Sequence, residues 1–92
     1  MALLIKTDGS ESTVVPKQGS RFSLEELWLH VGGFLQMLEL RTGRLLLLDE
    51  EGKNRPRNAR ATLLGRTAGI ANDDYVVGDV LICDESELPK DD

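Results

Sequence analysis

The sequence predicts an α+β fold: an antiparallel sheet of four or five strands covered by one main helix, with a short second helix. Two kinds of signal indicate this class. Short apolar or β-branched runs alternate with turn segments, as in antiparallel sheets. Residues 23–31 instead show helical spacing after a capping signal. The 92 residues fit one domain, which we place at 1–83, followed by an acidic, disordered tail at 84–92.

The first two strands are expected at 2–6 and 12–15. The turn residues at 8–10, Asp-Gly-Ser, separate an apolar run from a run rich in β-branched residues that Pro16 closes. Strands this close in sequence pair with each other, so we expect an antiparallel pair.

The main helix should begin after Ser23. Ser23 and Glu26 form a capping box, in which each side chain accepts a hydrogen bond from the other residue's backbone amide. Gly32 and Gly33 provide a stop. The apolar stripe of this helix consists of Leu24, Leu27, Trp28 and Val31. Because the tryptophan lies in this stripe, we expect it in the core.

A β-hairpin is expected next, from strands at 34–40 and 45–48. The loop at 41–44 contains a glycine and has hairpin length. Four consecutive leucines at 45–48 favour a strand buried on both faces, although such a run can also extend a helix. A homodimer interface would supply the second cover, so we expect a homodimer.

The short second helix should follow Asn58, which can cap it, since Pro56 disfavours a helical conformation at the residue before it. Ala61 and Leu64 then face inward, and Gly65 can end the helix. A loop at 67–74 leads to the last strand, expected at 75–83. Within that strand, Gly78 indicates a bulge or a close backbone approach.

Charge is unevenly distributed along this acidic chain, whose net charge is −5. Five basic residues and no acidic residue lie in 53–66, which we call the basic island. Residues 1–52 carry a net charge of −3, from five basic and eight acidic residues. Residues 67–92 carry −7, from one basic and eight acidic residues. Such separation creates a local patch that attracts anions on a molecule that otherwise repels them.

Catalysis lacks the residues it would need. His30, the only histidine, lies alone on the main helix, and Cys83 lies in an apolar strand, where burial raises a thiol pKa. The acidic run at 49–51 lacks the alternating ligands of a calcium loop, and no spacing fits zinc or a phosphate-binding loop. We therefore predict a non-enzymatic protein without cofactor or metal.

The basic island is the best candidate for a binding site. If Asn58 caps a helix, the first amides of that helix and the guanidinium groups of Arg57 and Arg60 converge on one point, where a phosphate or carboxylate can bind. The predicted ligand-binding residues are Gly32, Gly33, Arg55, Arg57, Asn58 and Arg60. Alternatively, the arginines pair with the carboxylates of the chain itself, an interpretation that we weigh slightly ahead.

Some partners and compartments are disfavoured. A net charge of −5 opposes binding to duplex DNA, which depends on counterion release, and aromatic residues are few. The longest apolar runs are too short for a membrane span or a signal peptide, so no membrane partner is expected. A single cysteine fits a reducing compartment, and we expect a cytoplasmic protein.

Several short motifs in order resemble a family of uncharacterised proteins, a domain of unknown function common in bacteriophages, plasmids and actinobacteria. They are Leu24-Glu25-Glu26-Leu27, Val31-Gly32-Gly33-Phe34, Asp49-Glu50-Glu51-Gly52-Lys53, Asn58 with Ala61-Thr62, and Val77-Gly78-Asp79-Val80-Leu81. The similarity spans residues 22–83. Gln36 departs from the family pattern, which has an acidic residue there. The resemblance implies an accessory protein of a mobile element and no particular reaction.

Two functional hypotheses follow. The protein sequesters an anionic, nucleotide-type ligand and so counters a host defence. Alternatively, its acidic segment at 67–92 imitates nucleic acid and blocks a basic groove of a host protein.

Overall fold

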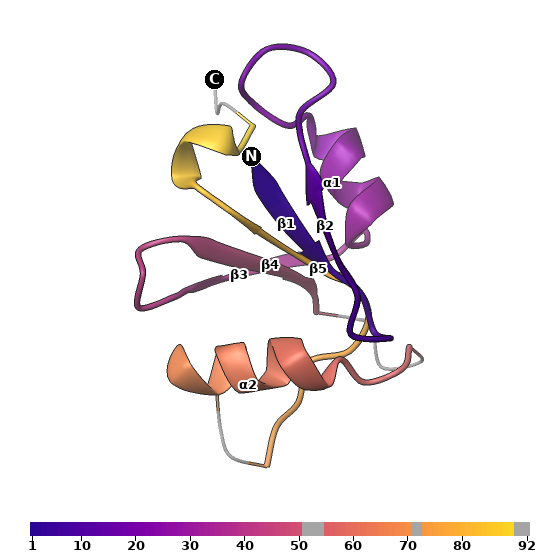
Figure 1. The fold of residues 1–92 in the computed structure, drawn as a ribbon, viewed down its shortest axis with the longest axis vertical. Coiled ribbons are helices and arrows are strands. Elements are labelled where there is room, and N and C mark those ends of the chain that lie inside the picture. Colours follow the sequence, from indigo (N-terminus) through magenta and orange to yellow (C-terminus); the bar gives the residue numbers. More distant parts are fainter. Residues whose placement is uncertain (51–54, 71–72, 90–92) are drawn as a thin grey trace.

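A computed structural model of the chain describes residues 1–50, 55–70 and 73–89. Two helices lie on opposite faces of a five-stranded antiparallel sheet (Figure 1), which confirms the predicted α+β class. The elements are β1 (Ala2–Ile5), β2 (Glu11–Val14), α1 (Leu24–His30), β3 (Leu35–Glu39), β4 (Leu45–Asp49), α2 (Ala59–Thr67), β5 (Val80–Cys83) and the 3-10 helix η1 (Glu85–Glu87).

The strands lie in the order β2-β1-β5-β4-β3, with β5 at the centre. The predicted pair β1–β2 and the predicted hairpin β3–β4 are both present, with Leu4 opposite Ser12 and Met37 opposite Leu47. The last strand joins them, because β5 pairs with β1 on one side and β4 on the other. β2 and β3 are therefore the two edges of the sheet.

Each face of the sheet carries its own hydrophobic cluster, because successive strand residues point to opposite faces. Under α1, the buried residues are Ala2, Leu4, Phe22, Leu27, Val31, Leu47, Leu81 and Cys83. Under α2, they are Ile5, Leu40, Leu46, Ala61, Val76, Val80 and Ile82. α2 therefore covers one face of the sheet. At nine residues it is longer than α1, which has seven.

The capping box at the start of α1 is confirmed, since Ser23 Oγ accepts from the Glu26 amide at 3.1 Å and Glu26 accepts from the Ser23 amide at 3.0 Å. The prediction that Trp28 belongs to the core is wrong, because this residue is 46% exposed. Phe22, the residue before the cap, is buried instead, in the same cluster as Leu27. This is the arrangement of a hydrophobic staple, in which the residue before the cap packs against the fourth residue of the helix.

The leucines of β4 are buried on both faces, as predicted, but both covers come from the same chain. Leu47 belongs to the cluster under α1 and Leu46 to the cluster under α2, and both are at most 1% exposed. The surplus apolar surface expected to drive dimerisation is therefore absent from this strand. A homodimer stays a prediction and would need another interface.

α2 begins as predicted after Asn58, whose side chain accepts from the Ala61 amide. The predicted stop at Gly65 is wrong, because the helix continues to Thr67. Gly65 is buried, and a Cβ there would lie 2.9 Å from the Ile70 side chain. The glycine therefore allows Ile70 to approach the helix, which is a packing role that local sequence signals do not distinguish from a stop.

The final strand is shorter than predicted. β5 starts at Val80, and Val77 forms an isolated bridge with Arg57. Gly78 has a positive φ of 75°, and a Cβ there would lie 2.9 Å from the Arg55 side chain. Gly78 is thus the predicted point of close approach, and it interrupts the strand.

Residues 84–89, which belong to the expected tail, contact the rest of the domain. Glu87, 6% exposed, caps η1, and its carboxylate lies 2.9 Å from the Met1 amino group. Its carbonyl accepts from the Phe22 amide, and Leu88 packs against the cluster under α1. These contacts extend past Cys83, the predicted domain boundary. A disordered tail stays a prediction, and its residues 90–92 lie outside the described part. No helix in the described ranges is long and apolar enough to cross a membrane.

Candidate functional site

Arg55 is a structural residue that holds the end of α1 near β4. Its guanidinium donates to the Val31 carbonyl and lies 3.2 Å from the Asp49 carboxylate, which is 6% exposed. A cation at the C-terminal end of a helix is favoured by the helix dipole. Both of these partners come from the chain itself, although the Arg55 side chain is 43% exposed.

Gly32 belongs to the same cluster. A Cβ at this position would lie 2.0 Å from an Asp49 carboxylate oxygen, and φ is +148°. Gly32 therefore lets the backbone pass directly beside Asp49, whereas Gly33 is exposed with nothing within 4 Å of a Cβ. Neither glycine is among the residues that line the arginine-containing cavity described below.

Asn58 is 1% exposed and its side chain is used entirely within the fold. Oδ1 accepts from the Ala61 amide, and Nδ2 donates to the carbonyls of Ile5 and Gly78, each at 3.0 Å. The predicted capping role is present, but the side chain has no access to a ligand.

The remaining two arginines of the predicted site differ from each other. Arg60 forms an ion pair with Glu11 at 2.7 Å, the alternative role that the sequence suggested. The Arg57 guanidinium instead stacks on the Tyr75 ring, 3.9 Å from its centroid. No carboxylate in the described ranges pairs with Arg57. Lys53 lies outside the described residues.

A groove of about 300 Å³ runs beside the start of α2 and contains this stacked pair. Its lining consists of Arg57, Ala59, Thr62, Leu63, Arg66 and Tyr75. Leu63 and Tyr75 are 62% and 42% exposed, so the groove offers open apolar and aromatic surface next to two guanidinium groups. We call it the arginine groove. Its volume lies at the small end of the range for ligand pockets, about 300–1,000 Å³.

Tyr75 also lines a second cavity, of about 460 Å³, with the opposite charge. Its lining is Gln36, Leu48, Asp49, Glu50, Asp74, Tyr75 and Val77. Asp49 is engaged by Arg55, whereas Asp74 accepts from the Tyr75 amide. Tyr75 thus lines both a cationic groove and an anionic cavity.

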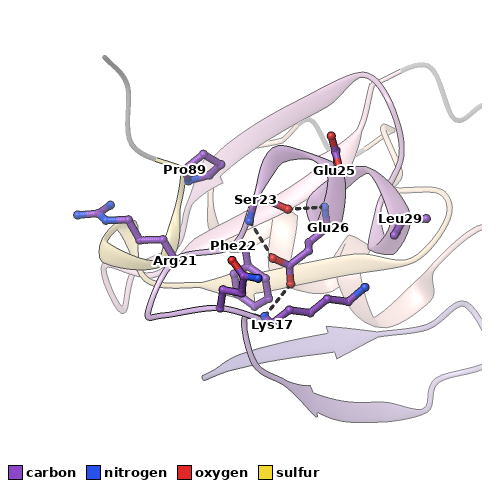
Figure 2. Close-up of a pocket in the computed structure, with 9 residues that line it drawn as sticks. Lys17, Arg21, Phe22, Ser23, Glu25, Glu26, Leu29 and Pro89 are labelled. Atoms are coloured by element: carbon purple, nitrogen blue, oxygen red, sulfur yellow. Dashed lines mark hydrogen bonds between the residues drawn. The ribbon is translucent and has the colours of Figure 1, made fainter.

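The largest cavity described, about 520 Å³, lies at the start of α1 (Figure 2). Figure 2 shows the Glu26 carboxylate turned toward the backbone amides of Ser23 and Lys17, from which it accepts hydrogen bonds of 3.0 Å each. These bonds, from Ser23 first and then Lys17, hold the pKa of Glu26 below its ordinary value of 4.5. The Glu26 carboxylate and the Ser23 hydroxyl therefore hold the helix start in place and are engaged within the fold.

The reactive side chains are held in structural positions. Burial, and secondly the negative charge of Glu87, raise the pKa of the Cys83 thiol to about 11, which suppresses the thiolate. His30 is half-buried and meets the Phe22 ring edge to face at 6.4 Å. Within the described ranges, no group of three or more His, Cys, Asp or Glu residues could hold a metal ion.

The described acidic residues of 73–89 do not share one surface. The segment that follows α2, with Asp73 and Asp74, and η1 lie at opposite ends of the molecule (Figure 1). Arg44 pairs with Asp84 at 3.1 Å and lies 3.8 Å from Glu87, which reduces the exposed negative charge further.

No family model, no curated protein and no solved structure matches this chain. The resemblance to phage and plasmid proteins stays a prediction.

Of the six predicted site residues, the structure places only Arg57 in the arginine groove. Sequence reasoning missed Tyr75 and did not include Arg66, although Arg66 belongs to the basic island. Tyr75 was assigned to a strand, and its contact with Arg57 depends on the bridge between Arg57 and Val77, twenty residues apart. Local patterns contain no signal for such a pairing.

Proposed function

We propose that this protein is a non-enzymatic binding protein that sequesters a small, anionic, nucleotide-type ligand in the arginine groove. The observation that supports it most directly is the Arg57–Tyr75 stack, an exposed cation and ring held together without a carboxylate partner.

The chemistry of this stack matches the ligand class. A guanidinium binds phosphate oxygens with two parallel hydrogen bonds, and an aromatic ring or a stacked guanidinium receives the flat face of a base. Arg66 also lines the groove and adds a second positive charge, and exposed Leu63 adds apolar surface. The carboxylates of the second cavity, which Tyr75 also lines, would accept hydrogen bonds from the N–H groups of a base.

The start of α2 strengthens the same site. The Asn58 side chain accepts a hydrogen bond from the Ala61 amide, and the Asn58 backbone carbonyl accepts one from the Thr62 amide. The first two amides of the helix therefore lack intrahelical acceptors. Those amides and the positive end of the helix dipole favour an anion beside Ala59, which lines the groove.

The resemblance to phage and plasmid accessory proteins supports a biological role for such binding. A protein that binds a nucleotide messenger without changing it would lower the free concentration of that messenger. A host defence that depends on the messenger would then be weakened. No reaction is required, which agrees with the suppressed reactivity of Cys83.

The experiment is native mass spectrometry and calorimetric titration of the protein with cyclic mononucleotides, cyclic dinucleotides and ADP-ribose-type nucleotides. We expect a stoichiometric complex with at least one of them. Arg57→Ala and Tyr75→Leu should each weaken it about tenfold or more, because stacking on an aromatic ring contributes about 1–3 kcal/mol per base.

Arg60→Ala is the matched control. It removes an arginine three residues further along the chain, in α2, that is paired with Glu11 and is not among the residues that line the groove. Its affinity should equal that of the unmodified protein. Failure of every nucleotide to bind, or an equal loss in the Arg60 and Arg57 variants, would contradict the proposal.

A further inference from the structure

β3 is an open edge of the sheet with an apolar groove beside it. A cavity of about 270 Å³ between β3, α1 and the residues after η1 is lined by Leu24, Leu27, Leu35, Met37, Leu47, Leu88 and Pro89. Leu24 and Met37, from α1 and β3 respectively, are 45% and 55% exposed. We call this cavity the α1–β3 groove.

The backbone of β3 offers hydrogen bonds outward. The Leu40 amide donates to the Arg44 carbonyl, and the Glu50 amide donates to the Phe34 carbonyl, so even-numbered residues bond to β4. In an antiparallel pair, bonding alternates along the strand. The amides and carbonyls of Leu35, Met37 and Glu39 therefore point away from β4, where no strand of the described residues pairs with them.

The other edge of the sheet is built differently. β2 presents Glu11, Ser12 and Thr13, all exposed, and such polar and charged residues protect an edge against added strands. β3 instead presents leucine and methionine on the face that carries the groove. The contrast marks β3 as the edge suited to receive another strand.

Glu39 specifies the charge of that strand. It lies on the same face as Leu35 and Met37, because strand residues alternate, and it is exposed. No basic group in the described ranges pairs with it. A directly opposite lysine or arginine would make a favourable cross-strand pair.

We propose that the α1–β3 groove binds an extended peptide segment of a partner protein, which adds to the sheet as a sixth strand antiparallel to β3. From its N-terminus, the segment has a basic residue opposite Glu39, an apolar residue opposite Met37 and another opposite Leu35, with one residue between each. Strand addition draws affinity from backbone hydrogen bonds and specificity from alternate side chains, which here enter the groove.

A second copy of this chain fits the edge less well. Pairing the full length of β3 with itself places Met37 opposite Met37 and the Glu39 carboxylate opposite Leu35, at the apolar groove. Desolvating that carboxylate without a cation is costly. The overall negative charge of the protein also attracts a basic segment and opposes self-association.

The probe is the fluorescent heptapeptide Ser-Lys-Thr-Val-Thr-Leu-Ser, titrated with the full chain and followed by anisotropy. We expect saturable binding. Met37→Pro should weaken it at least about tenfold, because proline removes an outward amide donor without removing a bond to β4. Replacing the peptide lysine by glutamate should weaken binding about threefold to tenfold, and Glu39→Lys should reverse this preference.

Thr13→Pro is the matched control, since it removes an outward amide at the opposite edge. The Lys6 amide donates to the Ser10 carbonyl, so the same alternation leaves the amide of Thr13 unbonded to β1. This variant should bind the peptide normally. If Met37→Pro does not fold by circular dichroism, the peptide N-methylated at valine tests the same hydrogen bonds on the unmodified protein.

Three results would overturn the proposal. They are absence of peptide binding, binding that neither proline substitution nor N-methylation weakens, and binding that is indifferent to charge reversal at Glu39. A dimer in analytical ultracentrifugation that Met37→Pro converts to monomer would assign the edge to a second copy, which also overturns it.

Discussion

Both helices of this protein begin with a side-chain cap, but the two caps differ in what else they hold. The hydroxyl of Ser23 bonds only to the amide of Glu26, three residues away, and Ser23 is exposed. Asn58 makes the same kind of local bond to Ala61, yet it is buried and also bonds to β1 and to the segment before β5.

A helix cap visible in the sequence therefore locates a helix without indicating how much the fold depends on it. The capping box of Ser23 is the stronger motif of the two. The three bonds of Asn58 join α2, the end of β1 and Gly78, so its loss would leave buried polar groups unpaired in three segments.

The largest effect that follows is that of Asn58→Ala. We expect a loss of about 3 kcal/mol in the free energy of unfolding, from one cap and two buried hydrogen bonds of about 1 kcal/mol each. For a domain of this size, the melting temperature should fall by about 10 °C or more. Circular dichroism during thermal and urea unfolding measures both quantities.

Asn58→Ser separates the two parts of this effect, because a serine can keep the cap but has no amide group for Ile5 and Gly78. It should recover only about 1 kcal/mol of the loss. A serine variant as stable as the unmodified protein would show that the bonds to other elements contribute nothing.

A smaller effect is expected for Ser23→Ala. It removes a single exposed cap bond, so the free energy of unfolding should fall by about 1 kcal/mol. The same urea titration provides the comparison. A loss equal to that of Asn58→Ala would contradict the distinction between a local cap and one that joins several segments.

The smallest effect concerns pH. The folded pKa of Glu26 lies below its ordinary value of 4.5, because the amides of Ser23 and Lys17 donate to its ionised form. Its contribution to stability is therefore complete above the unfolded pKa and is lost as the pH falls through the lower folded pKa.

Urea unfolding at a series of pH values from 6 to about 3 tests this. Glu26→Gln should lower stability near neutral pH, and the difference from the unmodified protein should shrink below pH 4.5. Glu25→Gln, one residue away, is the control. A difference that stays constant over the whole range would exclude the ionised carboxylate as the cause.

The parts of the fold that local patterns determine could be predicted from the sequence. The start of α1, the hairpin of β3 and β4, and the cap of α2 each depend on residues within a few positions. Trp28 was misassigned because this side of α1 is 46% exposed at the tryptophan, and Gly65 because a glycine needed for close packing of Ile70 looks like a helix stop. Periodicity gives the apolar side of a helix but not how much of it the sheet covers.

The candidate site was less predictable for the same reason. The basic island indicated arginines that attract anions. In the fold, however, Arg55 pairs with Asp49 of β4 and Arg60 pairs with Glu11 of β2, and local sequence patterns do not specify either pair. Only the pairing of Arg57 with Val77 brings Tyr75 into place. Charge along a sequence shows where cations are, whereas the fold decides which of them remain available.

The order of the strands has a consequence for synthesis on the ribosome. β1–β2 and β3–β4 are local hairpins that can form early, but each keeps an unpaired inner edge until β5, the last strand to be translated, inserts between them. The two halves of the sheet therefore become one domain in a single late step. A nascent chain paused before residue 80 exposes both inner edges to chaperones or to neighbouring chains.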